Sequence, residues 1–195
     1  MILRYACREV DYDSQHWAAL LFGRADIRAL RLCRLRGSQL ARSMSAELLC
    51  RALLSELDPE GVFAPAEDEL GKPYLPGSRF HISLSHSGDH VAAAVADAPI
   101  GIDLQELRTI SDRALLRWFS PSERNWIGSK NGSSRAIRLW TMKEAYGKLF
   151  GTGVFRGDRF QADFADDRLI CEYGGVSFLF PEAPKGLLFT ICLAK

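Results

Sequence analysis

Four segments of the chain are expected to be strands, and in one of them hydrophobic positions, Phe80, Ile82 and Leu84, alternate with polar ones. The segments are "ILRYACREV" near the start, then "RFHISLSHS", "HVAAAVAD" and "IGIDLQE" in the middle of the sequence. An apolar-polar period of two is typical of a strand with one buried face. The second and third segments are separated by the turn sequence "SGD", so we expect them to pair as a hairpin.

Helical spacing is clearest at residues 38–56, where apolar side chains recur every three or four positions. Helices are also expected at 14–22 and 26–36, on both sides of a turn at Ser120–Pro121, and over "SSRAIRLWTMKEAYGKLFG". Ser133 or Ser134 is the expected N-cap of this last helix, and Gly151 its stop. Short antiparallel strands are expected in the tail, from "RFQADF" to "GLLFTICLA". The pattern predicts an α+β fold in two halves, 1–99 and 100–195.

Composition excludes two broad classes of partner. The net charge is +1, which gives no global attraction to nucleic acid, and no apolar run approaches the roughly 20 residues of a membrane span. Five cysteines at wide spacing, with no C-x-x-C, predict reduced thiols and a cytoplasmic protein.

Two acidic residues in different elements are candidates for a metal site. Trp140, Glu144 and Lys148 follow one another at intervals of four, so they share a helical face. Asp103 ends an apolar strand, and if that strand abuts the helix, the Asp103 and Glu144 carboxylates converge. Magnesium takes one or two protein carboxylates together with substrate phosphates. The alternatives are an ordinary surface Glu–Lys pair and an aspartate that only ends a strand.

Several basic side chains are candidates for binding phosphate. His86 has hydroxyl neighbours and is suited to donate to a phosphate, whereas His81, His86 and His90 have no cysteine or further histidine at zinc-ligand spacing. Lys72 stands in the turn sequence "GKPYL". Arg24, Arg28 and Arg31 share one face of an expected helix, and Arg42 lies at the start of the next helix. These arginines form either a solvated face or a binding site for an anion. Neither a P-loop nor a dinucleotide-binding glycine motif is present. Together the candidates indicate a ligand with a divalent cation and several separated phosphates.

Four motifs in order resemble those of a known enzyme family. They are "GKPYL", "FHISLSHSGDHVAAAVADAPIGIDLQE", "FSPSE" and "WTMKEAYGKLFGTG". This series is similar to the Sfp-type 4'-phosphopantetheinyl transferases, or holo-[acyl-carrier-protein] synthases, over about residues 40–153. The resemblance implies a pseudo-dimer of two α/β halves with coenzyme A bound in the cleft between them, acting as a monomer.

The resemblance also implies an activity and a set of site residues. The family transfers the phosphopantetheine arm of coenzyme A to a serine of an apo acyl or peptidyl carrier protein, with Mg²⁺, and releases 3',5'-ADP. Asp103 and Glu144 would then be magnesium ligands, and Lys148 would contact the pyrophosphate. The implied contacts to the nucleotide and its 3'-phosphate are His86, Ser85, Lys72 and Arg42, with Arg28 and Arg31 as further basic contacts. Glu123, in "FSPSE", matches a family acid.

One position departs from the family pattern. The family often has a third acid two residues after the aspartate, and here that residue is Gln105. Its amide oxygen is a candidate ligand without charge, whereas Glu106 should point to the opposite side of the strand. We therefore expect a two-carboxylate site.

The expected chemistry is attack of the carrier serine on the β-phosphorus, with Glu144 or a magnesium-bound water beside it as the base. Lys148 and magnesium would stabilise the charge that develops on the departing nucleotide. Two other functions remain open. One is another magnesium-dependent enzyme that cleaves pyrophosphates by hydrolysis, and the other is an inactive homologue that binds coenzyme A or a carrier protein.

Overall fold

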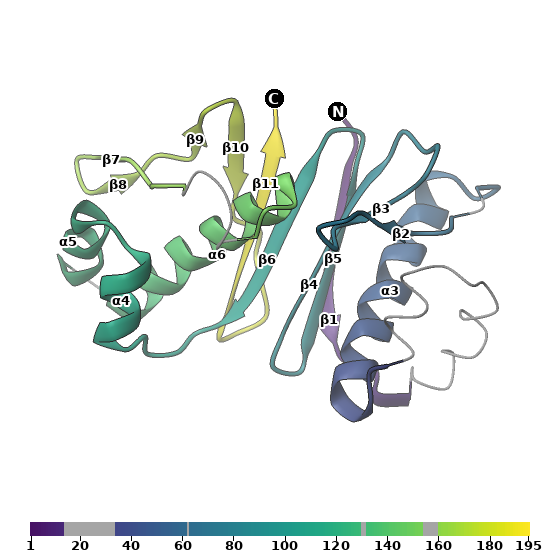
Figure 1. Cartoon of the computed structure of the whole chain (residues 1–195), viewed down its shortest axis with the longest axis horizontal. Helices are drawn as coiled ribbons and strands as arrows, with labels where there is room; N and C mark the ends of the chain where they lie inside the picture. The colour runs from purple at the N-terminus through teal and green to yellow at the C-terminus, as the bar shows by residue number, and fades with distance from the viewer. Residues whose placement is uncertain (14–33, 62, 130–131, 154–159) are drawn as a thin grey trace. The chain divides into compact units, whose positions relative to one another are not determined.

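The computed structural model describes residues 1–13, 34–61, 63–129, 132–153 and 160–195 (Figure 1). Within these ranges no helix is long and apolar enough to cross a membrane. The chain divides into two compact units, Met1–Ile100 (unit 1) and Gly101–Lys195 (unit 2). Both units combine helices with strands, which confirms the α+β class expected from the sequence.

Unit 1 is a three-stranded antiparallel sheet with one long helix against it. The strands, in the order β1-β5-β4, are β1 (Leu3–Glu9), β5 (His90–Ala96) and β4 (His81–Ser87). Ser87 pairs with His90, so the expected hairpin between β4 and β5 is confirmed. The helix is α3 (Gly37–Leu57), which lies along the sheet in Figure 1 and packs mainly on β5 and β4.

The side of α3 that faces the sheet is mostly apolar, but it also buries two polar groups. Met44 and Leu54 are fully buried there, as the helical spacing predicts. Ser45 accepts a hydrogen bond from the backbone N of Asp11 at 2.9 Å, and Glu47 pairs with Arg51 at 3.2 Å. Buried polar groups of this kind are tolerated because each has a partner.

A small hairpin completes unit 1. Its strands are β2 (Ala66–Glu67) and β3 (Pro73–Tyr74), which pair antiparallel. The hairpin falls in a segment whose prolines and glycines predict a loop, and its two-residue strands are too short to produce an alternating pattern.

Unit 2 is a four-stranded sheet with a long helix packed on it. The strand order is β6-β11-β10-β9, with bounds β6 (Ile100–Glu106), β11 (Leu187–Ala194), β10 (Val176–Leu179) and β9 (Glu172–Tyr173). The helix is α6 (Gly132–Phe150), whose main partner in the sheet is β11. Two shorter helices, α4 (Asp112–Trp118) and α5 (Pro121–Ser129), precede it, and a small hairpin joins β7 (Phe164–Ala165) to β8 (Arg168–Leu169).

Most elements expected in unit 2 are present, with two corrections. The two helices around Ser120–Pro121 and the tail strands are confirmed, although only the end of "RFQADF" is in a strand. The N-cap expected at Ser133 or Ser134 is wrong, because α6 already begins at Gly132 and both serines lie in its first turn. Gly151 does end the helix, at a left-handed φ of 72°. The helices expected at 14–22 and 26–36 fall almost wholly outside the described residues.

Candidate functional site

Strand β6 and helix α6 of unit 2 bring the predicted acidic pair together. Side chains alternate along a strand, so Gly101, Asp103 and Gln105 share one face of β6. At Gly101 this face lies directly against α6, because a Cβ built there would be 2.0 Å from the Ala145 carbonyl oxygen and 2.4 Å from the Leu149 nitrogen. Only glycine permits so close an approach of strand and helix. The strand and helix thus meet beside Asp103.

Asp103 is paired with a lysine from the helix. It is buried, with 5% of its surface exposed, and its Oδ1 accepts a hydrogen bond from Lys148 Nζ at 2.8 Å. Lys148 is partly exposed and closes the last turn of α6. A buried carboxylate and a partly exposed ammonium therefore lie in contact, as expected if the helix and strand abut.

Glu144 lies one turn before Lys148 on α6 and is close enough to Asp103 to sense its charge. Burial, and then the negative charge of Asp103, raise the pKa of Glu144 to about 6, while Lys148 acts in the opposite direction. A half-buried carboxyl group whose charged form is disfavoured by burial and by a neighbouring carboxylate is a typical setting for a divalent cation. The predicted convergence of Asp103, Glu144 and Lys148 is present in the structure.

The donor set near Asp103 consists of two acids and an amide. Gln105 is half-buried on the Asp103 face, whereas Glu106 is exposed. In the described ranges no group of three or more histidine, cysteine, aspartate or glutamate residues is placed to hold a metal. Carboxylate and amide oxygens are the hard ligands that Mg²⁺ takes, and one or two carboxylates suffice when a substrate supplies phosphate oxygens. The residues therefore fit magnesium as a sparse site.

Unit 1 presents Arg42 at the β4–β5 turn. The Arg42 Nε donates to the Gly88 carbonyl oxygen at 2.8 Å, and its Nη2 lies 4.0 Å from Asp89 Oδ1. The Tyr12 hydroxyl donates to the same aspartate. His86 stands just before this turn and is exposed, while Ser85 is buried, because adjacent residues of a strand face opposite sides. The guanidinium is thus held at the turn by the Gly88 carbonyl, beside the Asp89 carboxylate.

Lys72 lies toward the other end of β4. The Asp68 carboxylate accepts from the backbone N of both Leu70 and Lys72, at 2.9 and 2.8 Å, and so shapes the turn. Burial, and then the positive charge of Lys72, lower the pKa of His81. His81 and His86 are separated by about 17 Å along an extended strand. Unit 1 therefore divides the predicted nucleotide contacts between the two ends of β4. Arg28 and Arg31 lie outside the described residues.

Sequence reasoning missed a buried ion pair beside the acidic pair. Lys143, the residue before Glu144, donates to Glu123 Oε1 at 2.7 Å, and both side chains are buried. The Ser120-Pro-Ser-Glu123 order is a capping box, which signals the start of α5: Ser120 N donates to Glu123 Oε2 at 2.7 Å. No local signal indicates the pairing with Lys143, twenty residues later.

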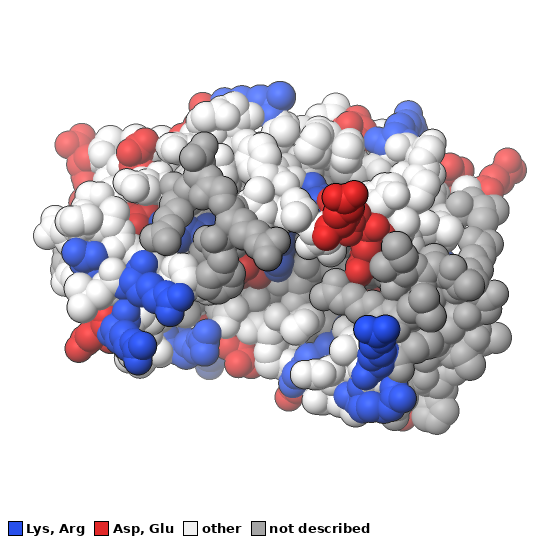
Figure 2. Space-filling view, viewed as in Figure 1, with Lys and Arg blue, Asp and Glu red and all other residues white. Residues whose placement is uncertain are grey.

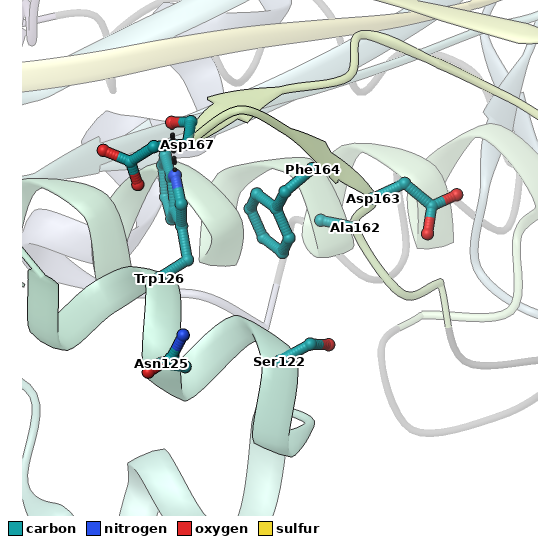
Figure 3. A pocket seen from close by; sticks show the side chains of 7 residues that line it. All are labelled: Ser122, Asn125, Trp126, Ala162, Asp163, Phe164 and Asp167. Carbon is teal, nitrogen blue, oxygen red and sulfur yellow. Dashed lines mark hydrogen bonds between the residues drawn. The ribbon is translucent and has the colours of Figure 1, made fainter.

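Unit 2 has a pocket of about 480 Å³ between α5 and residues 162–167, which include β7. Figure 3 shows the side chains that line it. Trp126 stacks on Phe164 at 5.0 Å and donates its Nε1 to the Asp167 carbonyl oxygen. The other lining residues are Ser122, Asn125, Ala162 and Asp163. None of the candidate site residues lines this pocket, so it is separate from the Asp103–Glu144–Lys148 cluster.

A known protein family is similar to this chain over the segments that carry the Asp103–Glu144–Lys148 cluster. The family model of the 4'-phosphopantetheinyl transferase superfamily matches residues 99–175, which contain β6, α4, α5 and α6. The chain is 37% identical over 134 residues to 4'-phosphopantetheinyl transferase psf-1 of Bacillus pumilus, covering 65% of this chain and 57% of that protein. It is 32% identical over 149 residues to a 4'-phosphopantetheinyl transferase of Bacillus subtilis, covering 72% and 63%.

A cyanobacterial relative, 4'-phosphopantetheinyl transferase HetI of Nostoc, is 40% identical over 98 residues, which is 45% of this chain and 41% of that protein. The chain thus aligns with between 41% and 63% of the length of these three curated relatives. The same enzyme family is indicated by the ordered motifs, by the family model that matches residues 99–175 and by these relatives. Over residues 99–175 the chain matches the 4'-phosphopantetheinyl transferase superfamily, and it is similar to members of that family along part of their length.

Proposed function

We propose that this chain transfers the 4'-phosphopantetheine group of coenzyme A to a serine of an apo acyl or peptidyl carrier protein and releases 3',5'-ADP. The observation that carries the proposal is the convergence of Asp103, Glu144 and Lys148 inside the segment that matches the family. The curated relatives support it because they are named for this transfer.

The reaction requires little covalent chemistry of the protein. The serine oxygen forms a bond to the β-phosphorus of the pyrophosphate, the bond from that phosphorus to the bridging oxygen breaks, and the nucleotide leaves with the electron pair. Glu144 is our candidate to accept the serine proton, because a carboxyl with a pKa of about 6 is mostly ionised at pH 7. Lys148 is placed to stabilise charge on the pyrophosphate, since its ammonium is partly exposed.

Asp103 and Glu144, with Gln105 as an uncharged neighbour, are the residues that would hold magnesium. When bound there, Mg²⁺ would neutralise charge on the pyrophosphate as the nucleotide departs. Asp103 also orients Lys148 through their 2.8 Å contact. With only two carboxylates, metal binding should depend on the phosphates of the substrate more strongly than at a three-acid site.

Unit 1 is proposed to bind the nucleotide. Arg42 and His86 at the β4–β5 turn, with Ser85, are our candidates for phosphate contacts, and Lys72 is the candidate at the other end of the strand. The Arg42 guanidinium is suited to this because it is held in place by the Gly88 carbonyl and because its planar donors match the oxygens of a phosphate. The pseudo-dimer with coenzyme A between its halves, the cytoplasmic location and the monomeric state stay predictions.

The carrier protein is proposed to dock on α4. Figure 2 shows Lys and Arg side chains gathered where Figure 1 draws this helix, at the lower left, and Arg113 and Arg117 of α4 are exposed. Leu116 on the same helix has 68% of its surface exposed, and α4 contains no buried residue. Carrier proteins that this family modifies are acidic helical bundles. The arginines of α4 would attract such a protein, and Leu116 would provide an apolar contact with it.

The test is to mix the purified chain with coenzyme A, Mg²⁺ and a panel of apo carrier proteins, and to weigh the intact carriers with and without a chelator. A carrier that gains a phosphopantetheine mass only with Mg²⁺ supports the proposal. Hydrolysis of coenzyme A without any carrier would instead support a pyrophosphate-cleaving enzyme. Binding of coenzyme A with no product would indicate an inactive homologue or a missing partner, and Gln105→Glu would separate these, since it restores the third acid.

A further inference from the structure

The ion pair between Glu123 and Lys143 is the most deeply buried charged group in the described part of unit 2. The Lys143 side chain is 7% exposed and that of Glu123 is fully buried. Glu123 Oε1 also accepts from the backbone N of Ala162 at 2.9 Å, and Lys143 Nζ also donates to the Phe160 carbonyl oxygen at 2.7 Å. With the Ser120 contact, the pair joins three segments: the start of α5, the chain at 160–162, and α6.

Stability alone does not explain a pair of this kind. Taking two charges out of water costs several kcal/mol per ion, and well-packed apolar residues of similar size often do as well or better. The surroundings would accept an apolar replacement, because the Lys143 ammonium lies 5.7 Å from the centres of both the Phe119 and the Phe160 rings. A buried ion pair differs from an apolar contact mainly because it is directional: its hydrogen bonds form in only one geometry.

The directional contact of Lys143 also affects the orientation of Glu144, the next residue of α6. Successive residues of a helix point about 100° apart, so Lys143 projects into the core of unit 2 while Glu144 projects toward Asp103. Fixing Lys143 at Glu123 therefore fixes the rotation of α6 about its own axis at the turn that carries Glu144. For a helix about 5–6 Å in radius with its side chains, a rotation of 10° moves the carboxylate by about 1 Å. Functional side chains need to be held within about 0.5 Å.

We propose that Glu123 and Lys143 are positioning residues, which orient Glu144 toward Asp103 and thereby set the affinity of that pair for a divalent cation. Neither residue touches the substrate; they act through the rotation of α6. The proposal rests on the proposed function in so far as the metal serves transfer, but metal binding itself is measured without a carrier protein.

The experiment compares Glu123→Gln with a matched control, Glu47→Gln. Glu47 lies in unit 1, its side chain is 3% exposed, and it pairs with Arg51 at 3.2 Å, so both substitutions remove the charge of a buried, paired glutamate. Three quantities are measured: the free energy of unfolding in urea, the Mn²⁺ affinity by titration calorimetry with coenzyme A present, and kcat and KM for transfer. We expect both variants to be less stable. Only Glu123→Gln should weaken Mn²⁺ binding and lower kcat, by roughly tenfold to a hundredfold, the loss usual for outer-shell partners of a metal site.

The double variant Glu123→Gln/Lys143→Met separates positioning from stability. It removes the uncompensated lysine charge, so stability should return toward that of the wild type, whereas Mn²⁺ affinity should stay low. Mn²⁺ affinity that recovers together with stability would overturn the proposal, and so would equal loss of affinity in Glu47→Gln. A wild-type chain that binds Mn²⁺ but modifies no carrier of the panel would count against the proposed function alone and leave this inference standing. A wild type that binds no Mn²⁺ would refute the inference.

Discussion

Replacing Gly101 by alanine should separate β6 from α6 and disturb the acidic pair. The new Cβ would lie 2.0 Å from the Ala145 carbonyl oxygen and 2.4 Å from the Leu149 nitrogen, and both are backbone atoms of the helix. Since contacts under 3.0 Å are essentially never seen, α6 must move by at least about 1 Å. Forcing an extra methyl group into a packed site costs typically about 1–3 kcal/mol, and we expect the upper end because backbone cannot rotate away.

The same movement should act on the Lys148–Asp103 contact. Lys148 immediately precedes Leu149 in α6 and is hydrogen-bonded to Asp103 at 2.8 Å, so a shift of about 1 Å breaks this hydrogen bond or bends it out of line. Gly101→Ala is therefore expected to lose about 3 kcal/mol of stability and to lower both Mn²⁺ affinity and transfer.

The assay is urea unfolding followed by tryptophan fluorescence and circular dichroism, with Gly128→Ala as the control. Gly128 lies in α5 of the same unit, and a Cβ built there has nothing within 4 Å. Alanine should be neutral there or stabilise by up to about 1 kcal/mol, because glycine is the poorer helix former. A Gly101→Ala variant within about 0.5 kcal/mol of the wild type, the range of ordinary surface substitutions, would refute the argument that this glycine is required by the close approach.

Three further predictions concern the proposed reaction. Glu144→Gln and Asp103→Ala should each abolish carrier modification by mass spectrometry while the circular dichroism spectrum stays native, and normal turnover by either would remove it from the proposed site. Arg42→Ala should raise KM for coenzyme A by roughly tenfold to a hundredfold, the loss of a hydrogen bond to a charged group. It should affect dephospho-coenzyme A much less, and equal effects on both would argue against a 3'-phosphate contact. Arg113→Glu/Arg117→Glu should raise KM for an acidic carrier, most strongly at low salt, with KM for coenzyme A unchanged; a salt-independent effect would speak against steering.

Local patterns predicted the elements of the fold better than they predicted burial. The β4–β5 hairpin follows from a period of two and a turn sequence, and α3 from a period near 3.6, which are properties of single segments. Burial depends on partners elsewhere in the chain. Ser83 and Ser85 of β4 are 4% and 5% exposed although the pattern assigned them to a polar face, and Ala52 of α3 is exposed although it belongs to the predicted apolar stripe.

The candidate site shows the same limit. Spacing within α6 placed Glu144 and Lys148 on one face, and alternation within β6 placed Asp103 and Gln105 on another. That these faces meet depends on the contact at Gly101, which was not interpreted as a packing position. The role of Lys143 depends on a partner twenty residues away, and no periodicity within α6 separates a buried, paired lysine from a solvated one.

The sequence predicts that Asp103 ends an apolar strand, but it is buried in the middle of β6, and stability gives a carboxylate little reason to be there. Its contact with Lys148 joins a carboxylate that is 7% exposed to an ammonium that is 30% exposed, and such pairs gain little over the cost of removing the carboxylate from water. Gly101, on the same face of β6, weakens the strand because it has no side chain to pack. Gly101 and Asp103 are both unfavourable for stability, and both are explained if the function of β6 is to hold a carboxylate against α6. Residues that cost stability but together place one functional group are expected at functional sites. The buried Glu123–Lys143 pair is also costly, and we propose that it places Glu144 in the same way.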